Sequence, residues 1–133
     1  MADDPGRSVD LKWLGEDQYA IFVSYSEEVT LEIFQDLMDR FHEMLNSVDY
    51  PVAVIADMTR LRRLPKNLLG HSPKLALHPW WTHENVARII VAVDRGMMER
   101  VIEIFSRVFI KVHAFGTLDE ALAYAERSRS SSG

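Results

Sequence analysis

The spacing of apolar residues changes several times along the chain, and each change marks a predicted element. Residues 9–14 alternate between apolar and polar side chains, which predicts a half-buried strand. A turn-like stretch at residues 15–18 then leads into the apolar residues 19–25, so we expect the two strands to form a β-hairpin. The first strand carries its apolar side chains on one face and its charged ones on the other: Val9, Leu11 and Trp13 against Asp10 and Lys12.

Three- and four-residue spacing then replaces the alternation and predicts an amphipathic helix. Thr30 is a suitable N-cap for this helix, and Val29 and Phe34 would pack across the cap as a hydrophobic staple. Residues 46–50 would end the helix. Its predicted apolar stripe consists of Leu31, Phe34, Leu37, Met38, Phe41 and Leu45.

Two uninterrupted apolar runs are too short for buried helices and predict strands that are covered on both faces. The first is residues 52–56, Val-Ala-Val-Ile-Ala, between Pro51 and Asp57. The second is residues 86–93, Val-Ala-Arg-Ile-Ile-Val-Ala-Val. We expect the first run to be the central strand of the sheet.

The second half of the chain continues to alternate between strand and helix. Pro65 is suited to open a short helix after the central strand, and Asp94 is suited to cap the next helix. A further strand is expected at residues 109–115, followed by a capping-box pattern at residues 117–120. The predicted order is β-β-α-β-α-β-α-β-α. This order calls for an α/β fold with a single sheet of about five strands, mostly parallel, with an antiparallel N-terminal hairpin.

The length of 133 residues suits a single domain. We expect this domain to span residues 9–127, between a flexible leader at residues 1–8 and a polar tail at residues 128–133. The acidic start has no features of a signal peptide, and no apolar stretch approaches the roughly 18 residues of a membrane span. These features predict a cytoplasmic protein with no integral membrane segment.

Charge and cysteine content argue against several kinds of function. The formal net charge is −5, which disfavours nucleic acid as a partner because phosphates are bound through positive charge. The absence of cysteine excludes disulfides, zinc–thiolate sites and thiol catalysis. No serine has the surroundings of a nucleophile elbow, and the chain has no glycine-rich phosphate loop. We therefore expect a protein that is not an enzyme and needs no cofactor.

Three segments carry a resemblance to a known family. The first is the central strand with the Asp57-Met58-Thr59 triplet that follows it, and the second is residues 87–91, Ala-Arg-Ile-Ile-Val. The third is residues 112–122, which read as a closing strand, a turn and a helix that begins Leu-Asp-Glu-Ala-Leu. Together they resemble the STAS superfamily, especially its SpoIIAA-like branch, which overlaps the lipid-binding SEC14-like C-terminal fold. The resemblance spans roughly residues 11–127 and implies a bacterial regulatory domain with a non-catalytic function.

The resemblance does not supply a functional site. In the anti-sigma-factor antagonists of the family, a kinase phosphorylates a serine that opens the helix after the central strand. The corresponding positions here are about Pro65, Lys66 and Asn67, none of which carries a hydroxyl. Thr59 and Ser72 are nearby hydroxyl residues. A phosphorylation-driven exchange of partners is therefore not expected in its usual form.

Asp57 and Asp94 each follow a predicted strand, at the end of an α/β sheet where ligands commonly bind. A magnesium-dependent phosphoacceptor site built on this pair is one hypothesis. We favour the alternative that each carboxylate caps its own connection. A metal site at His71, His78 and His83 is not favoured, because their spacing does not place two imidazoles on one helix face.

The stretch from residue 57 to residue 81 combines positive charge with large apolar side chains. Arginine and aromatic residues are favoured at docking surfaces, so this stretch is the candidate contact region for a protein partner. The same residues would suit a lid over a small apolar or lipid-like ligand. They would equally suit an irregular loop that completes the core. The candidate residues are Asp57, Thr59, Arg60, Arg62, Arg63, Lys66, Trp80 and Trp81.

The leading functional hypothesis is a non-enzymatic regulatory domain that binds a protein partner or associates with itself as a homodimer. The alternative is a carrier or sensor of a small apolar or lipid-like ligand.

Overall fold

The structure is a computed structural model that describes residues 9–25, 28, 30–62, 83–105 and 112–131. Its elements follow the order β1 (Val9–Leu14), β2 (Ala20–Tyr25), α1 (Leu31–Asn46), β3 (Val52–Met58), β4 (Val86–Val93), α3 (Arg95–Phe105), β5 (Val112–Phe115) and α4 (Leu118–Ser131). The strands form one five-stranded sheet in the order β1-β2-β3-β4-β5, in which β1 is antiparallel to β2 and all other neighbours are parallel. The predicted mixed sheet is confirmed.

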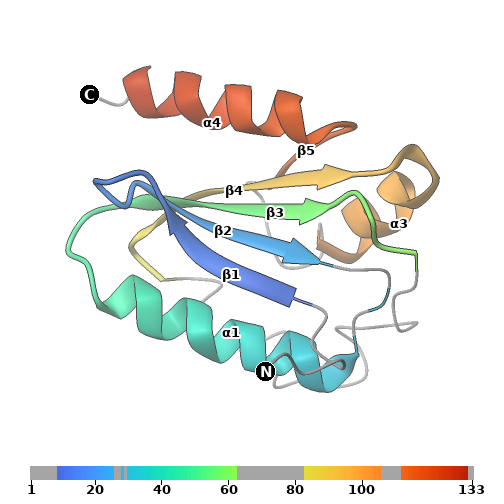
Figure 1. Ribbon diagram of the computed structural model, residues 1–133, viewed down its shortest axis with the longest axis horizontal. Helices are drawn as coiled ribbons and strands as arrows, with labels where there is room; N and C mark the ends of the chain where they lie inside the picture. The colour runs from blue at the N-terminus through green and yellow to red at the C-terminus, as the bar shows by residue number, and fades with distance from the viewer. Residues whose placement is uncertain (1–8, 26–27, 29, 63–82, 106–111, 132–133) are drawn as a thin grey trace.

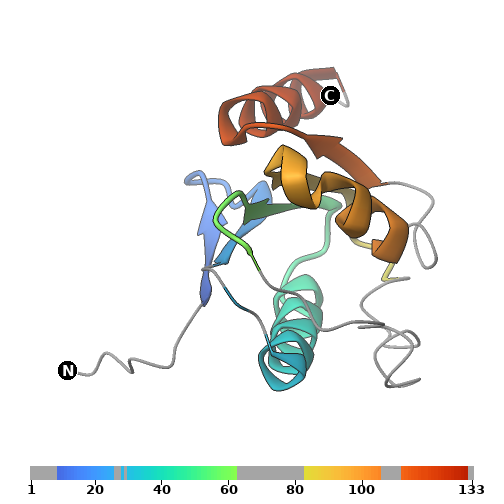
Figure 2. The same ribbon diagram turned by 90° about the vertical axis from the view of Figure 1, so that its right-hand side faces the viewer.

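Helices cover the sheet on both faces. Helix α1 lies against one face and α4 against the other, so the sheet is the middle of three layers (Figures 1 and 2). Met97 and Met98 of α3 pack against the same apolar cluster as α1. This cluster is the larger of the two cores, because alternate residues of β2, β3 and β4 point into it together with the apolar stripe of α1.

The N-terminal hairpin is built as its alternation predicted. Gly15 adopts φ +78°, a left-handed conformation that would be strained for a residue with a Cβ, so the turn favours glycine at this position. The Tyr50 hydroxyl lies 3.2 Å from the Asp17 carbonyl and 3.1 Å from the Gln18 carbonyl, which share its one proton, and this ties the turn to the connection between α1 and β3. The hairpin is therefore fixed by its own turn and by a long-range contact.

Helix α1 begins and ends where the sequence indicates. The Thr30 hydroxyl accepts a hydrogen bond from the Ile33 N–H at 3.2 Å and caps the first turn. Ser47 closes the last turn, where its N–H bonds to the Glu43 and Met44 carbonyls. Five members of the predicted stripe are buried: Phe34, Leu37, Met38, Phe41 and Leu45.

Strand β3 is the middle strand of the sheet, and it is two residues longer than the apolar run that predicts it. Its residues alternate between the cores, so Val54 and Met58 face α1 while Ile55 faces α4. Asp57 is thus the penultimate strand residue rather than the first residue after the strand. Met58 extends the strand because its side chain still packs in the core between the sheet and α1.

Helix α4 extends to Ser131, whereas the sequence predicts a polar tail from residue 128. No glycine or proline interrupts the chain before Gly133, so the helix continues past the last apolar residue. Ser128 lies three residues after the buried Ala125 and is itself only 8% exposed. The small hydroxyl side chain therefore continues the buried face of the helix.

Several expectations fall on residues outside the described ranges. They are the leader at residues 1–8, the staple at Val29, the short helix opened by Pro65 and the first part of the strand at 109–115. In the part of the chain that the structure describes, no helix has the length and apolar character needed to cross a membrane.

Candidate functional site at the carboxyl edge of the sheet

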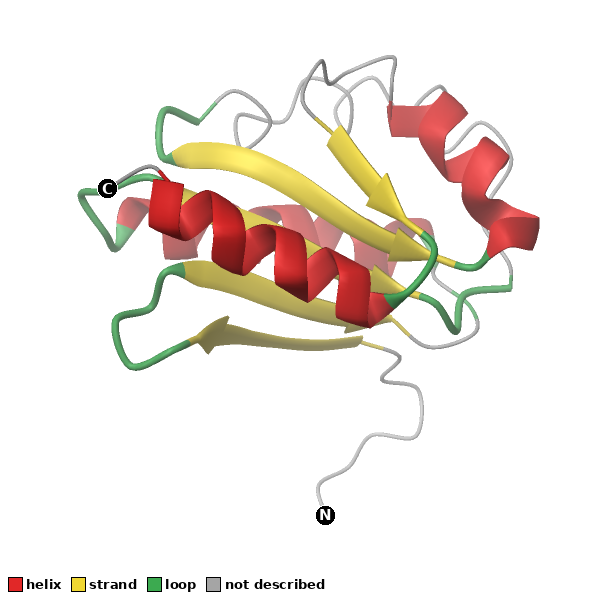
Figure 3. Ribbon diagram, turned by 90° about the horizontal axis from the view of Figure 1, so that it is seen from above, coloured by secondary structure: helices red, strands yellow, loops and turns green. Residues whose placement is uncertain are grey.

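The carboxyl ends of the parallel strands meet at one edge of the sheet, which we call the carboxyl edge (Figure 3). The strand register aligns Ser24 of β2 with Asp57 of β3, Asp57 with Ala92 of β4, and Ala92 with Phe115 of β5. Directly paired residues in neighbouring strands share a face. Asp57 therefore sits in the middle of a cross-strand row on the face that α4 covers.

Asp57 is a buried carboxylate that organises the turn after β3. It is 8% exposed, and its Oδ1 accepts one hydrogen bond from the Thr59 N–H at 3.0 Å and another from the Thr59 hydroxyl at 2.7 Å. Both donors come from the residue two positions ahead, which is the geometry of an Asx turn. Asp57 thus caps its own connection, and the proton of the Thr59 hydroxyl is committed to that carboxylate.

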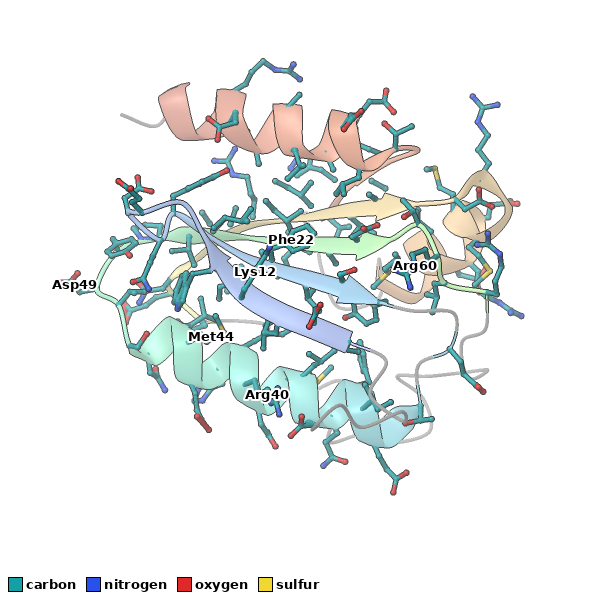
Figure 4. All side chains as sticks on the ribbon, viewed as in Figure 1. Lys12, Phe22, Arg40, Met44, Asp49 and Arg60 are labelled. Carbon is teal, nitrogen blue, oxygen red and sulfur yellow. The ribbon has the colours of Figure 1, made fainter. Side chains whose placement is uncertain are left out.

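The rest of this turn is anchored by a residue buried between the sheet and α1. The Leu61 N–H donates to the Met58 carbonyl at 3.1 Å, and the Leu61 side chain is fully buried in the core below α1. Arg62 folds back along the turn, where its Nη1 donates to the carbonyls of Thr59 at 3.2 Å and of Leu61 at 3.1 Å. Arg60 is exposed between these anchors (Figure 4). Arg62 is exposed as well, but its guanidinium is bound to the carbonyls of the turn, whereas Arg60 extends from a backbone that its neighbours hold.

Asp94 follows β4 at the same edge and also serves its own turn. Its Oδ2 accepts from the Gly96 N–H at 3.2 Å, and its carbonyl accepts from the Met97 N–H at 2.9 Å. Asp94 is exposed and precedes the first residue of α3, Arg95. Among the residues that the structure describes, no three histidine or carboxylate side chains converge as a metal site.

His83 lies at the opposite end of β4, away from the carboxyl edge. Its Nδ1 accepts from the Asn85 N–H at 3.0 Å, so its Nε2 carries the proton and donates to Asn46 Oδ1 at 2.8 Å. The Asn85 side chain in turn donates to the Leu45 and Val48 carbonyls after α1. His83 therefore joins the end of α1 to the start of β4. His71 and His78 lie outside the described residues.

Tyr25 ends β2 beside this edge, on the face toward α1. It is 3% exposed, and burial raises the pKa of its phenol above the ordinary value. The phenol therefore stays neutral at physiological pH and offers neither charge nor a base to the carboxyl edge.

The structure brings together four of the candidate residues in one turn: Asp57, Thr59, Arg60 and Arg62. The other four, Arg63, Lys66, Trp80 and Trp81, lie outside the described residues. Sequence reasoning missed Leu61 as the anchor, although a lone leucine between basic residues is the signal for it. It also missed Arg95, an exposed arginine that follows β4. The ends of β3 and β4 meet through the pairing of Met58 with Val93, and this pairing cannot be seen in the sequence.

Two solved structures share this architecture. One is an anti-sigma factor antagonist from Mycobacterium paratuberculosis, with a TM-score of 0.59 and 18% identity over 90% of this chain and 95% of that one. The other is an uncharacterised protein of the DUF3478 family with a SpoIIAA-like fold from Shewanella loihica PV-4, with a TM-score of 0.64 and 13% identity over 94% of this chain and 99% of that one. No family model and no curated protein sequence matches the chain. The chain therefore has a SpoIIAA-like fold.

Proposed function

We propose that this chain is a non-enzymatic regulatory domain that binds a protein partner through the carboxyl edge, with Arg60 as the central contact. The observation that carries the proposal is the construction of the turn after β3. Asp57, Leu61 and Arg62 all hold the backbone of this turn, whereas Arg60 is displayed. A contact held in place before binding loses little conformational entropy when a partner arrives.

Charge at this edge supports a partner with an acidic surface. The chain as a whole has a net charge of −5, yet Arg60 and Arg62 follow β3 and Arg95 follows β4. Arg63 and Lys66 continue the basic strip in the sequence. A local positive surface on an acidic protein favours association with a complementary acidic one and disfavours wrong partners.

The mycobacterial structure supports a protein as the partner, because it is described as an antagonist of an anti-sigma factor. The present chain departs from the usual serine at about residues 65–67, so partner exchange here would not depend on phosphorylation at that position. We propose recognition by surface complementarity alone, in the cytoplasm.

The test compares two exposed arginines on different surfaces of the full chain. Arg60→Glu reverses the charge at the carboxyl edge, and Arg40→Glu reverses it on the outer side of α1, where Arg40 pairs with Asp36 at 3.1 Å (Figure 4). Proteins captured from the native cell extract by the wild-type chain would be identified, purified and titrated by calorimetry. We expect Arg60→Glu to weaken binding roughly tenfold to a hundredfold, and Arg40→Glu to leave it within about twofold.

Arg62 is less suited to this test, because its guanidinium braces the turn and its reversal would disturb folding as well as binding. Equal affinities for wild type and Arg60→Glu would contradict the proposed surface. Native mass spectrometry of gently purified protein addresses the alternative: a retained small apolar or lipid-like molecule, with no captured protein, would favour a carrier or sensor.

A further inference from the structure

The sheet has an open edge at β1. Strand β1 pairs with β2 on one side, and Figures 2 and 3 place it at the outer margin of the sheet, with no described helix or strand beyond it. The N–H and C=O groups of an edge strand are a template on which another strand can add. Natural edge strands commonly carry charges that prevent unwanted pairing, so the charges on β1 decide what this edge accepts.

The sequence of β1 is self-complementary when it is read in the opposite direction. Residues 9–13 are Val-Asp-Leu-Lys-Trp, with Leu11 at the centre. The residues on either side of Leu11 are an acid and a base, Asp10 and Lys12, and both are exposed. The outer two, Val9 and Trp13, are both apolar and half-buried.

We propose that β1 is a homodimer interface, at which a second copy of this chain adds its own β1 in antiparallel orientation. A two-fold axis at Leu11 would place Asp10 opposite Lys12 of the partner subunit and Lys12 opposite Asp10 of the partner subunit. Leu11 would face the partner's Leu11, and Val9 would face the partner's Trp13. Opposite charges and aromatic–β-branched pairs that face each other across strands each stabilise a sheet.

The charges select this register against its neighbours. An axis moved to Asp10 would set that carboxylate against Asp10 of the partner subunit, and an axis moved to Lys12 would set the two ammonium groups against each other. Like charges directly opposite one another in a sheet are destabilising. Pairing centred on Leu11 therefore satisfies both charges, whereas the adjacent symmetric registers satisfy neither.

The two faces of the sheet are also suited to this pairing. Val9, Leu11 and Trp13 pack against the core below α1 and remain partly exposed, so a second β1 would cover them and join the two cores. On the other face, Lys12 pairs with Phe22 of β2, and its ammonium group lies 5.7 Å from the centre of the Phe22 ring (Figure 4). Helix α4 packs mainly over β3, β4 and β5 and reaches the turn end of the hairpin through Tyr19 and Glu126, while Lys12 itself remains exposed to the partner's Asp10.

The interface goes beyond the proposed function, because it lies on β1 and does not include Arg60 or the turn after β3. The dimerisation constant of the full chain would be measured by analytical ultracentrifugation for wild type, Asp10→Lys and Lys12→Asp. Each single change sets like charges opposite one another at both symmetric positions, so we expect each to weaken the dimer roughly tenfold or more. The double exchange, Asp10→Lys with Lys12→Asp, restores both pairs and should restore the dimer.

Mixing the two single variants gives a sharper result, because one supplies two lysines and the other two aspartates. We expect this mixture to form a heterodimer with affinity near that of wild type, while each variant alone is largely monomeric. Circular dichroism would show that all four proteins are equally folded. A wild-type chain that remains monomeric up to about 1 mM, or a dimer that neither single change weakens, would overturn the proposal.

The register has a separate test, because the chain contains no cysteine. Oxidation of Leu11→Cys should yield a cross-linked dimer, since the two thiols would face each other at the axis. Oxidation of Lys12→Cys should not, because its thiol would face Asp10 of the partner subunit. Cross-linking at residue 12 but not at residue 11 would contradict this register.

Discussion

The two faces of the sheet are packed by different means. Toward α1, large side chains from strands and helix fill a thick core, which includes Ile21, Val23, Phe34, Met38, Leu45, Val54 and Met58. Toward α4, the buried residues are Ala20, Ile55, Ile90, Ala92, Ala121 and Ala125, of which four are alanine. The α1 face therefore gains its stability from buried apolar volume, and the α4 face from the close approach of a helix over small residues.

We expect this difference in packing to make the two helices differ in the substitutions that they tolerate. Helix α4 is held partly by polar contacts at its margins, where the Tyr19 hydroxyl donates to Glu126 at 2.9 Å and the Tyr124 hydroxyl lies 3.3 Å from His113 Nε2. Helix α1 is also bonded at its end, through Asn46 and the Leu45 carbonyl, but it presents a continuous apolar stripe to the sheet. Replacing a large side chain with a small one should lower the stability of the protein most on the α1 face, and replacing a small side chain with a large one should lower it most on the α4 face.

The largest expected effect is therefore a deletion on the α1 face. Leu45 is fully buried near the end of α1, and Leu45→Ala would remove apolar contacts and leave a cavity. We expect this change to lower the free energy of unfolding by about 2–5 kcal/mol in urea denaturation. A loss below about 1 kcal/mol would mean that the α1 face relaxes around the gap and is not the rigid core that its packing indicates.

The α4 face should respond to the opposite change. Ala121 is fully buried where α4 approaches the sheet, so Ala121→Leu would push the helix away from Ile55 and Ile90. We expect a loss of about 1–3 kcal/mol from this overpacking. Ala123→Leu, on the exposed side of the same helix, is the matched control and should change stability by no more than about 0.5 kcal/mol. Equal losses for the two variants would remove the distinction between the faces.

The contrast between the faces also shows what the sequence was able to predict. Period was sufficient for the hairpin and α1, because their apolar residues recur regularly enough to define a buried face, whereas β3 and β4 were predicted from the short length of their uninterrupted apolar runs. It did not place the end of α4, since Ser128 is buried without being apolar. Small side chains on a tightly packed face carry a weak hydrophobic signal, so the extent of such a face is hard to read.

The carboxyl edge was predictable only in part. The sequence marked Asp57, Thr59, Arg60 and Arg62 as a group because they are neighbours in the chain. It did not distinguish Arg60, which is displayed, from Arg62, which bonds to the carbonyls of its own turn. That distinction depends on side-chain directions within a single turn, and residue type alone does not specify them.

The smallest expected effect concerns a polar group on the α1 face. Tyr25 is buried there, and burial raises the pKa of its phenol above the ordinary value of about 10. The unfolded chain therefore releases the phenolic proton first as pH rises, so the stability that this group contributes is intact below about pH 10 and declines above it. We expect wild type to lose about 1.4 kcal/mol relative to Tyr25→Phe at pH 11, compared with their difference at pH 8. Urea denaturation of both proteins at the two pH values measures this difference, and other groups that titrate in this range cancel because both proteins carry them.

If the stability of wild type and of Tyr25→Phe changed equally with pH, the phenol would ionise as readily in the folded chain as in the unfolded one. Such a result would mean that water reaches Tyr25 at the end of β2, so that the core on the α1 face is accessible to solvent at the carboxyl edge.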